Sequence, residues 1–372
     1  MNYLNIVIVS GVIFPRIAPR AFRATELAKA LSKKGHSVTL IASLGDYDYN
    51  NFEKQTGIKV KNLGTSYFAL INSDGKINVP IWKKGVIYLL MKLLHFPDIL
   101  LTVKAKKAVL KENKIDILIT IAIPHSIHWG VSLISIKKRN FNTWISDCGD
   151  PFMGNLVSKP YFYFKYIEKY WGNKTDFITV PVIEAKKAYY KEVENKIYEI
   201  PQGFDFSEVR LSAYKKNDVP TFLYAGLFYS EKRDPTRFLK YLSTINTNFK
   251  FIIYTSKADL IKPYLDVLKD KIEIRESVDR DVLLLEMSKA DFLINIKNKG
   301  ISSQVPSKLI DYCLSKRPIL EISSAFTKEE KENFDGFLID DYSGQKIIEN
   351  FERYNSTHIA EEFLKLHQLK NE

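Results

Sequence analysis

The chain has 372 residues, of which 45% are hydrophobic and 13% aromatic, and this composition excludes an intrinsically disordered protein. The length exceeds what one ordinary hydrophobic core requires and fits two domains. Lysine and arginine number 55 against 43 acidic residues, which gives a formal net charge of +12. This surplus suits an anionic partner such as nucleotide phosphates, nucleic acid or an acidic lipid surface, although a compositional bias towards lysine explains it equally well.

Cysteine usage and the N-terminus bear on the cellular compartment. The two cysteines, Cys148 and Cys313, lack the spacing of a metal cluster, so we expect a reducing environment. The apolar start of the chain has neither a basic region before it nor a small-residue cleavage site after it, and it predicts a first strand rather than a signal peptide. No apolar run approaches the ~20 residues of a membrane span. We therefore expect a cytoplasmic protein that is soluble or peripheral on the inner membrane face.

Short apolar segments alternate with helical patterns along the first half of the chain. A helix is predicted over about 20–34, which carries "RATELAKALSKK" at helical spacing. Continuous apolar runs separated by helices indicate parallel strands that are buried on both faces. The strands predicted in this series are 5–10, 37–43, 114–122, 143–148 and 176–181.

The segment 196–206 ends that series, and a second series of strands follows it. These strands are predicted at 221–228, 249–256, 271–277, 291–297 and 318–324. The fold class is therefore α/β, with two Rossmann-like, doubly wound parallel-sheet domains. We expect the first domain at 1–183, a linker at 184–205 and the second domain at 206–357, with a final helix at 358–372 that packs back on the first domain.

The segment 80–112 is less typical of such a fold. Its "IWKKGVIYLLMKLLHF" (81–96) mixes aromatic, aliphatic and lysine residues at helical spacing. A helix of this kind can lie on an anionic membrane surface. An ordinary helix packed on the sheet explains the pattern as well.

The stretch "VPSKLIDYCLSKRPIL" (305–320) places three polar side chains within one helical turn. Ser307 is predicted as the N-cap of a helix whose first amides and dipole favour an anion, and Lys308 adds a positive charge there. Asp311, one turn deeper on the same face, can accept two hydrogen bonds from a vicinal diol such as a ribose. The spacing fits a nucleotide diphosphate, and it also fits a capped helix with a chance lysine and aspartate.

Two further groups of cations follow predicted strands. In "YAGLFYSEKRDP" (224–235), Gly226 allows close backbone approach at a strand end, and Lys232 and Arg233 follow where phosphates can bind. As an alternative, Lys232 and Arg233 form a solvated pair in a basic chain. In the first domain a loop entering a helix carries Arg16, Arg20 and Arg23, and the chain lacks the G-x-G-x-x-G fingerprint of NAD-binding proteins.

Taken together, these segments resemble the GT-B glycosyltransferases, and specifically the family-4-like bacterial enzymes that build surface polysaccharides. The resemblance covers nearly the whole chain. It lies in "ELAKALSKKGHSVTLIAS" (26–43), "DILITIAIPHSIHWGVSLI" (116–134), "WISDCGDPF" (144–152), "IYEIPQGFDF" (197–206) and "VPSKLIDYCLSKRPIL" (305–320). The third segment is similar to the family's "WIxDxRDPW", and the last is similar to "xPxKLxEYxAxGKPVI".

The resemblance implies a nucleotide-sugar donor held mainly by the second domain. Asp311 matches the ribose-binding glutamate of the family motif, and Lys232 matches a lysine that binds the donor phosphates. Leu227 stands where the family has an arginine, so Arg233 is expected to supply the second cation. Ser303 replaces the first of two glutamates that many members carry, which leaves the sugar open; retention at the anomeric carbon is expected from the resemblance.

In the first domain, His128 matches the histidine of the family's "PPxSxH", which usually lies near the transferred sugar. Asp150 is the candidate for placing the acceptor or for base assistance, and Arg16, Arg20 and Arg23 are candidates for an acceptor diphosphate. We expect a saccharide acceptor, which the family's role implies is lipid-linked, and no obligate metal or other cofactor. The plainer alternatives are a packed His128 and an Asp150 that caps a turn.

Two other functions remain open from the sequence. A sugar-nucleotide epimerase or hydrolase of the same architecture would also bind a nucleotide at such a helix. A nucleic-acid-binding protein would explain the net charge, but the cations are scattered and no recognisable binding module is present, so we expect no nucleic-acid partner.

Overall fold

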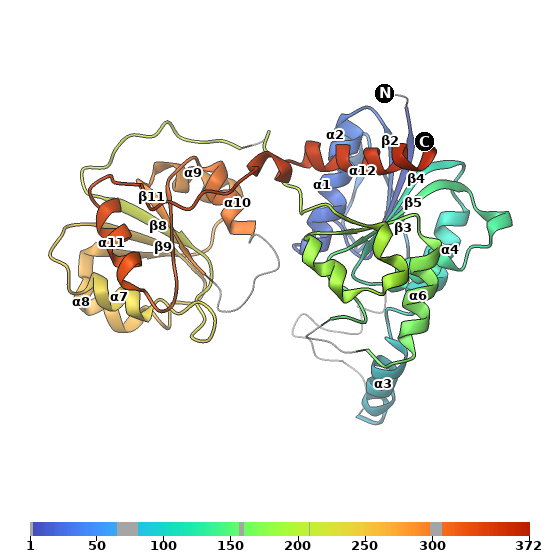
Figure 1. The fold of residues 1–372 in the computed structure, drawn as a ribbon, viewed down its shortest axis with the longest axis horizontal. Coiled ribbons are helices and arrows are strands. Elements are labelled where there is room, and N and C mark those ends of the chain that lie inside the picture. Colours follow the sequence, from blue (N-terminus) through green and yellow to red (C-terminus); the bar gives the residue numbers. More distant parts are fainter. Residues whose placement is uncertain (1–2, 65–80, 156–159, 208, 298–306) are drawn as a thin grey trace. The chain divides into compact units, whose positions relative to one another are not determined.

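Two parallel sheets organise the chain, as the computed structural model shows (Figure 1). They lie in separate units, one formed by Met1–Asp205 with Arg353–Glu372 and the other by Phe206–Glu352. The structure describes residues 3–64, 81–155, 160–207, 209–297 and 307–372, without the side chains of 81–84 and 307.

The first sheet has the strand order β3-β2-β1-β4-β5-β6-β7, and each neighbouring pair is parallel. The order reverses between β1 and β4, so the sheet is doubly wound. Its strands are β1 (Asn5–Ser10), β2 (Ser37–Ala42), β3 (Lys59–Asn62), β4 (Ile115–Ala122), β5 (Phe141–Cys148), β6 (Phe177–Val180) and β7 (Ile197–Glu199).

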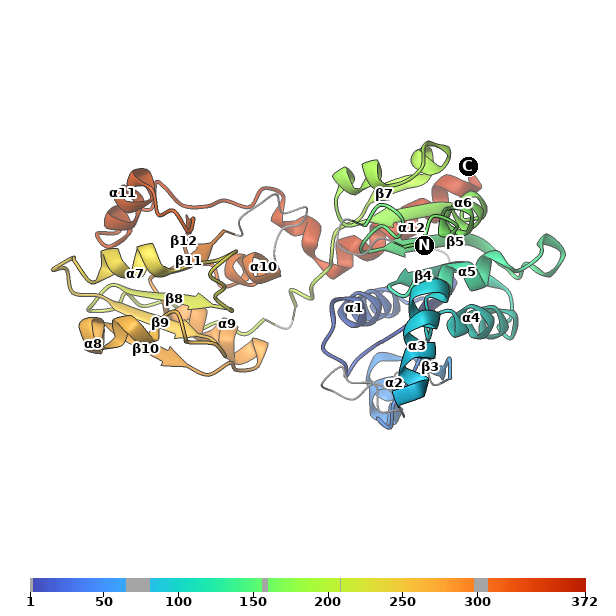
Figure 2. The ribbon, with the colours of Figure 1, turned by 90° about the horizontal axis from the view of Figure 1, so that it is seen from below.

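Helices cover both faces of this sheet (Figure 2). The helices of this unit are α1 (Pro19–Lys33), α2 (Asn50–Thr56), α3 (Ile81–Leu94), α4 (Leu100–Leu110), α5 (Ser126–Ser132), α6 (Phe164–Lys174) and α12 (Ser356–Asn371), of which α3 projects away from the sheet. Short 3₁₀ helices lie at Ile136–Lys138, Ile183–Ala188, Lys191–Lys196 and Phe351–Tyr354.

The alternation of side chains along β1 explains why its sequence is apolar throughout. Ile6 and Ile8 pack with α1 and α12 on one face, whereas Val7 and Val9 pack with residues of α4, α5 and α6 on the other. Both faces of a parallel strand are therefore buried, which is why the strand reads as a continuous apolar run. The polar strand β3 was not predicted, because as an edge strand it keeps only Val60 of its side chains half-buried.

The segment 184–205 corrects the expected domain boundary. We predicted a linker there, but two 3₁₀ helices fill its first part and β7 then pairs with β6, with Ile197 opposite Ile178. Ile197 and Val193 are buried in the core of the first unit. The sheet therefore takes up this segment as its last strand, and the second unit begins at Phe206.

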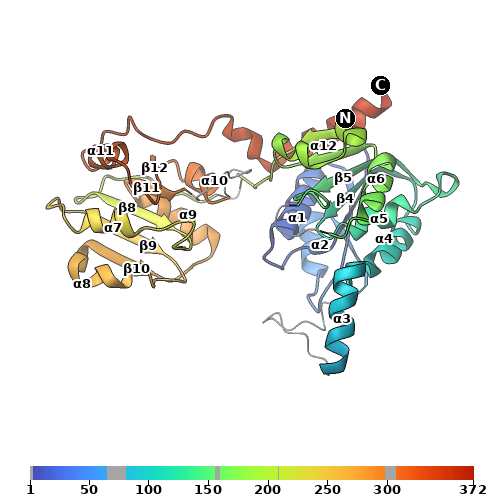
Figure 3. The same ribbon diagram turned by 60° about the horizontal axis from the view of Figure 1, so that its bottom comes forward.

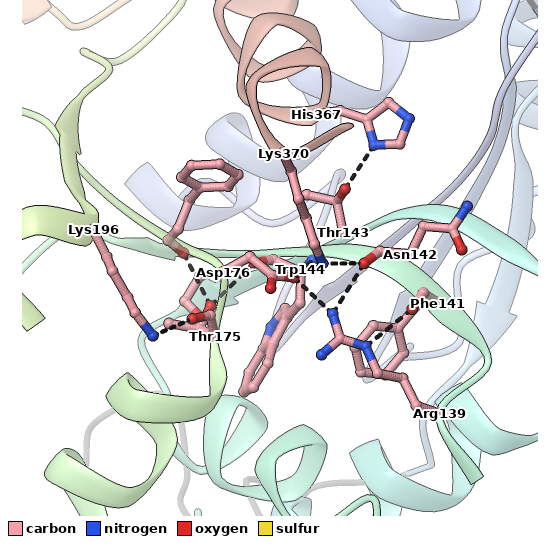
Figure 4. A network of polar contacts seen from close by, with 12 residues as sticks. Arg139, Phe141, Asn142, Thr143, Trp144, Thr175, Asp176, Lys196, His367 and Lys370 are labelled. Carbon is pink, nitrogen blue, oxygen red and sulfur yellow. Dashed lines mark hydrogen bonds and ion pairs between the residues drawn. The ribbon is translucent and has the colours of Figure 1, made fainter. Parts of the chain in front are cut away.

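The final helix, α12, belongs to the first unit and packs against α1. Its Ile359 and Phe363 are buried in the same core as β1 and α1. Near its C-terminus the ammonium of Lys370 bonds Asp176 Oδ2 at 2.6 Å, and His367 Nδ1 lies 2.7 Å from Thr143 Oγ1 (Figure 4). These contacts tie the end of the chain to the amino ends of β5 and β6.

The second sheet has the order β10-β9-β8-β11-β12, and it is also entirely parallel. Its strands are β8 (Thr221–Ala225), β9 (Lys250–Tyr254), β10 (Ile272–Arg275), β11 (Phe292–Ile296) and β12 (Ile319–Ile322). The helices of this unit are α7 (Thr236–Leu242), α8 (Leu265–Leu268), α9 (Arg280–Lys289), α10 (Ser307–Leu314) and α11 (Lys328–Phe337), with 3₁₀ helices at Lys262–Tyr264 and Lys269–Lys271.

Aromatic side chains form the core of the second unit. Phe222 at the centre of the sheet stacks on Phe251 and Phe292, with ring centres 4.6 and 5.0 Å apart, and meets Phe334 of α11 edge-on at 5.3 Å. A capping box, in which Thr327 and Glu330 exchange hydrogen bonds, begins α11. The predicted fold class of two doubly wound, parallel α/β units is confirmed.

Candidate functional site

The strand order of the second sheet reverses between β8 and β11, and ligands of open parallel sheets bind at the carboxyl ends of such strands. The loop 226–235 leaves β8 at this point. Its first residue, Gly226, has a φ of 138°, a backbone conformation that other residues rarely adopt. The glycine singled out in the sequence therefore stands where a ligand would approach the backbone.

Tyr224, the fourth residue of β8, lies beside two of the cations that the sequence singled out. The ammonium of Lys308 is 4.9 Å from the centre of the Tyr224 ring. A methyl group on Gly226 would lie 3.4 Å from the Tyr224 hydroxyl and 3.7 Å from Arg233 Nη1. Burial raises the pKa of Tyr224 to about 12, although the Arg233 guanidinium works against that rise. Lys308, Tyr224 and Arg233 thus gather at the end of β8.

The ammonium of Lys308 is buried and has no hydrogen-bond partner among the residues that the structure describes. Burial, reinforced by repulsion from Arg233, lowers the pKa of Lys308 to about 7, and the attraction of Glu321 only partly opposes this. Arg233 Nε is likewise buried without a partner in the described part of the chain. Because burying the N–H groups of a cationic side chain without hydrogen bonds is costly, these two donors in one place favour a bound anion.

Asp311 lies one turn into α10 and forms an ion pair with Arg280 of α9. Arg280 Nε and Nη2 lie 2.8 and 2.7 Å from Asp311 Oδ1. Burial raises the pKa of Asp311, and the Arg280 guanidinium opposes that shift. The next residue, Tyr312, accepts a 2.9 Å hydrogen bond from the amide of Ala225 and so ties α10 to the end of β8. The structure therefore adds Arg280, which the sequence did not reveal, to the predicted ribose-binding carboxylate.

A pocket of about 710 Å³ lies beside the loop that follows β8. Lys232 and Arg233 line it, and Lys257, which follows β9, lines it as well. The aromatic ring of Tyr229 has Arg233 Cζ at 5.6 Å and Lys257 Nζ at 6.0 Å from its centre. Lys257 was missed in the sequence, although a lysine placed directly after a parallel strand is the signal that identifies such a residue. Three cations of this pocket therefore come from two neighbouring strand ends.

The arginines expected to bind an acceptor in the first unit do not share one role. Arg23 is buried and makes a double contact with Asp147, with Nη2 2.7 Å from Oδ1 and Nε 3.1 Å from Oδ2. Its guanidinium also donates to the carbonyls of Ile200 and Pro201. The prediction that Arg23 binds the acceptor is wrong, because this side chain fastens α1 to β5 and to the segment after β7.

Arg20 lies at the end of β5, beside the loop that carries Asp150. A methyl group on Gly149 would come within 2.4 Å of Arg20 Cζ, so the guanidinium lies directly on that glycine. Arg20 Nη1 is 3.6 Å from Asp147, and burial lowers the pKa of Arg20 against the attraction of that carboxylate. Asp150 is exposed, and so is Arg16 in the loop after β1. Arg20 and Asp150 thus remain candidates for the acceptor, together with Arg16.

His128 is a core residue in this structure. Its side chain is fully buried, with Nδ1 2.7 Å from Thr120 Oγ1 and Nε2 3.4 Å from Cys148 Sγ. Its ring lies 4.9 Å from that of Trp171, and burial lowers the pKa of His128 well below its usual value. The prediction that His128 orients the transferred sugar is therefore corrected, since both ring nitrogens face protein atoms.

The loop after β5 is held from inside the first unit by two residues that the sequence did not single out for this role. His125 Nε2 lies 3.2 Å from the carbonyl oxygen of Asp150. Glu168 of α6, which is buried, accepts a 3.3 Å hydrogen bond from the amide of Met153. Burial raises the pKa of Glu168 to about 7, and the amides of Met153 and Phe152 oppose this rise. These contacts set the position of Asp150 at the sheet edge.

Ser303 lies outside the described residues, and of Ser307 only the backbone is described, as the first residue of α10. Within the described ranges, no group of three or more histidine, cysteine or acidic side chains is arranged to hold a metal ion. The expectation that activity needs no metal stays a prediction.

Solved structures similar to this chain extend over its whole length. The lipopolysaccharide outer core galactosyltransferase WaaB, in its apo form, matches 98% of this chain and 99% of its own, with a TM-score of 0.60 and 11% identity. This chain has the GT-B fold. No protein-family model matches the sequence, and a comparison with curated proteins also gives no match.

Two further similar structures bear names that state different ligands or activities. HepE from Anabaena, solved in complex with UDP-glucose, matches 99% of this chain and 98% of its own with a TM-score of 0.52 and 10% identity. A UDP-N-acetylglucosamine 2-epimerase matches 100% of this chain and 98% of its own with a TM-score of 0.54 and 11% identity. At these identities the comparisons establish the GT-B fold, and the site residues carry the argument about chemistry.

Proposed function

We propose that this GT-B protein is a glycosyltransferase that moves a sugar from a nucleotide-sugar donor to an acceptor hydroxyl. The observation that carries the proposal is the buried, unpartnered ammonium of Lys308 beside the unpartnered Nε of Arg233. Both side chains lie where the strand order reverses, which is where α/β sheets bind nucleotides. The structures of WaaB and of HepE with UDP-glucose support this reading.

The reaction places a specific demand on these cations. The bond between the anomeric carbon and the donor diphosphate breaks, while a new bond forms between that carbon and the acceptor oxygen. Negative charge builds on the departing diphosphate, and Lys308, Arg233 and the exposed Lys232 would stabilise it. Asp311 would bind the ribose hydroxyls. Asp150, exposed at the end of β5, is the candidate that would accept the proton released by the acceptor hydroxyl.

The finer assignment also belongs to this proposal. We propose a hexosyl transfer to a saccharide acceptor that is lipid-linked, in the synthesis of a cell-surface polysaccharide, with retention at the anomeric carbon. The name of WaaB, a lipopolysaccharide outer core galactosyltransferase, supports this assignment of the acceptor. Arg20 and Arg16 are the cations of the first unit that would meet an acceptor diphosphate.

Titration calorimetry of a panel of UDP- and GDP-sugars with Lys308→Met tests the proposal. The variant keeps the length of the side chain but removes its charge, so we expect donor affinity to fall about 10- to 100-fold. Lys240→Met, which removes an exposed lysine of α7 in the same unit, is the matched control and should bind as the parent does. Equal affinities for the parent and Lys308→Met would refute the placement of the donor.

A sugar-nucleotide epimerase is the second candidate, because two UDP-N-acetylglucosamine 2-epimerases, one of them described as putative and from Listeria monocytogenes, match the full length of this chain. Such an enzyme converts its nucleotide sugar without any acceptor. Incubation of the purified protein with UDP-N-acetylglucosamine alone, followed by NMR of the sugar, separates the two functions. Epimerised or hydrolysed sugar at catalytic rates would replace the transferase proposal.

A further inference from the structure

Helix α3 carries large apolar side chains that no described residue covers. Val86, Tyr88, Leu89, Met91 and Leu94 have exposed fractions between 38% and 66%. At ~100° per residue these positions fall on all sides of the helix. In Figures 1 and 3 the helix projects away from the sheet of its own unit. Exposed apolar side chains gathered on one short helix mark a surface that interacts with an apolar partner.

The base of α3 is firmly held, although its body is exposed. His95, the residue after the helix, packs its ring 5.1 Å from that of Phe152 and 5.8 Å from that of Phe164. The hydroxyl of Tyr163 donates to the carbonyl of Leu93. The projecting helix is therefore anchored on the aromatic core of the first unit. Phe162 and Tyr166, which flank this anchor on and before α6, are exposed as well.

The sequence that includes α3 and α4 is strongly basic. Between residues 81 and 114 the sequence has eight lysines against one aspartate and one glutamate, a surplus of six that is half of the net charge of +12. Lys92 on α3 is exposed, as are Lys107 on the following helix α4 and Lys111 directly after that helix. An apolar helix within a lysine-rich surface complements a membrane that carries negative headgroups.

We propose that α3 and the lysines of α4 form a docking surface for the anionic face of a lipid bilayer. The helix has 14 residues, or a length of about 21 Å, which is less than the ~20 residues that a span requires. No helix in the described ranges combines enough length and apolarity to cross a membrane. The apolar side chains of α3 therefore enter one leaflet at the level of the headgroups, and the lysines bind those headgroups.

This surface also connects with the proposed acceptor site, a consequence that rests on the proposed function. Phe152, against which His95 packs, lies two residues after Asp150 in the loop that follows β5. A first unit docked through α3 would hold that loop next to the membrane, where a lipid-linked acceptor resides. The docking itself requires no nucleotide sugar, so it can be tested independently of the enzymatic proposal.

Flotation with vesicles of phosphatidylcholine alone, and with 30% phosphatidylglycerol added, tests the docking surface. We expect binding to the anionic vesicles at low salt, little binding to the neutral ones, and loss of binding at high salt. Leu89→Glu and, separately, Tyr88→Glu place a charge on the exposed face of α3 and should each lower the partition coefficient about tenfold or more. Because both side chains are exposed, circular dichroism should show an unchanged fold.

Matched controls lie on the second unit. Val267→Glu changes an exposed apolar residue of α8, and Lys328→Glu reverses an exposed lysine of α11 for comparison with Lys107→Glu. Both controls should bind vesicles as the parent does, whereas Lys107→Glu should weaken binding. Absence of binding to anionic vesicles, or equal binding by Leu89→Glu and the parent, overturns the proposal. A dimer in solution that Leu89→Glu converts to a monomer, without vesicle binding, assigns the surface to a second copy of the chain instead.

Discussion

The ammonium of Lys308 and the aromatic ring of Tyr224 lie 4.9 Å apart, and this cation–π contact joins the start of α10 to the end of β8. Burial and repulsion from Arg233 lower the pKa of Lys308 to about 7, and the ring face offers the ammonium less stabilisation than a carboxylate or water would. Burial of the Lys308 ammonium therefore lowers the stability of the ligand-free protein, and a bound diphosphate would offset that cost by pairing with the ammonium.

The lowered pKa of Lys308 gives the stability of the second unit a defined pH dependence. With a folded pKa of about 7 against the usual 10.5, the unfolded chain binds more protons between these values. Stability should therefore rise as the pH increases through this window, and Lys308→Met should lack this contribution. Thermal unfolding of the parent and the variant at pH 7 and pH 9.5 measures it. A constant difference between the two proteins would show that folding does not lower the pKa of Lys308.

The two members of the Asp311–Arg280 ion pair should have different roles, with Asp311 binding the donor and Arg280 positioning Asp311. Asp311→Asn should lower donor affinity about a hundredfold, because the carboxylate would make charge-assisted bonds to the ribose. Arg280→Gln should cost less, about tenfold, since it acts by orienting Asp311. Calorimetry with UDP and 2′-deoxy-UDP checks the role: the parent should prefer UDP, and Asp311→Asn should lose that preference. An Asp311→Asn protein that still discriminates between them would exclude ribose binding.

Arg23 and Asp147 should matter for stability rather than for the acceptor. Arg23→Met leaves Asp147 buried without its main partner, and we expect the free energy of unfolding to fall by about 3–5 kcal/mol. Arg16→Ala, at an exposed position, should change it by less than about 0.5 kcal/mol. Chemical denaturation of the full chain, followed at the unfolding transition of the first unit, measures this free energy. If Arg23→Met were as stable as the parent, the assignment of Arg23 to the core would fail.

Glu168 contributes a pH dependence of opposite sign. Burial raises its pKa from the usual 4.5 to about 7, so the folded protein binds more protons than the unfolded chain in that window. Its contribution to stability should be present below pH 4.5 and lost as the pH rises through 7, with an amplitude on the order of 3 kcal/mol. Glu168→Gln should remove this slope, which unfolding at pH 5 and pH 8 reveals. An identical slope in the variant would mean that another group titrates.

The final helix should be required for the first unit to fold. Phe363→Ala removes a fully buried ring of α12 and should destabilise the first unit by about 3–5 kcal/mol. Leu369→Ala, on the exposed side of the same helix, should have little effect. Unfolding followed by tryptophan fluorescence suits this test, since Trp144 and Trp171 are both buried in the first unit. Equal effects of the two variants would place α12 outside the core.

Much of the fold could be predicted from local patterns, and the misses have a common cause. The strand β1 and the helix α1 were predicted to within one or two residues, because Ile6 to Val9 form a continuous apolar run and Leu27 and Leu31 recur at helical spacing. The strand β7 was taken for a linker, because three residues are too few to show a period. Only its pairing with β6 identifies it.

In the candidate site, too, some features follow from the local sequence and others only from tertiary contacts. The sequence alone determined that Lys308 and Asp311 lie one turn apart on a helix after a buried strand, since helical geometry is local. Only the tertiary structure decided which basic side chains keep hydrogen-bond donors available for a ligand: Arg23 meets Asp147 across 124 positions, whereas Lys308 meets an aromatic ring. Periodicity records which face of an element is buried, but the partner on that face comes from distant parts of the chain. The burial of His128 between β4, β5 and α6 has this same physical reason.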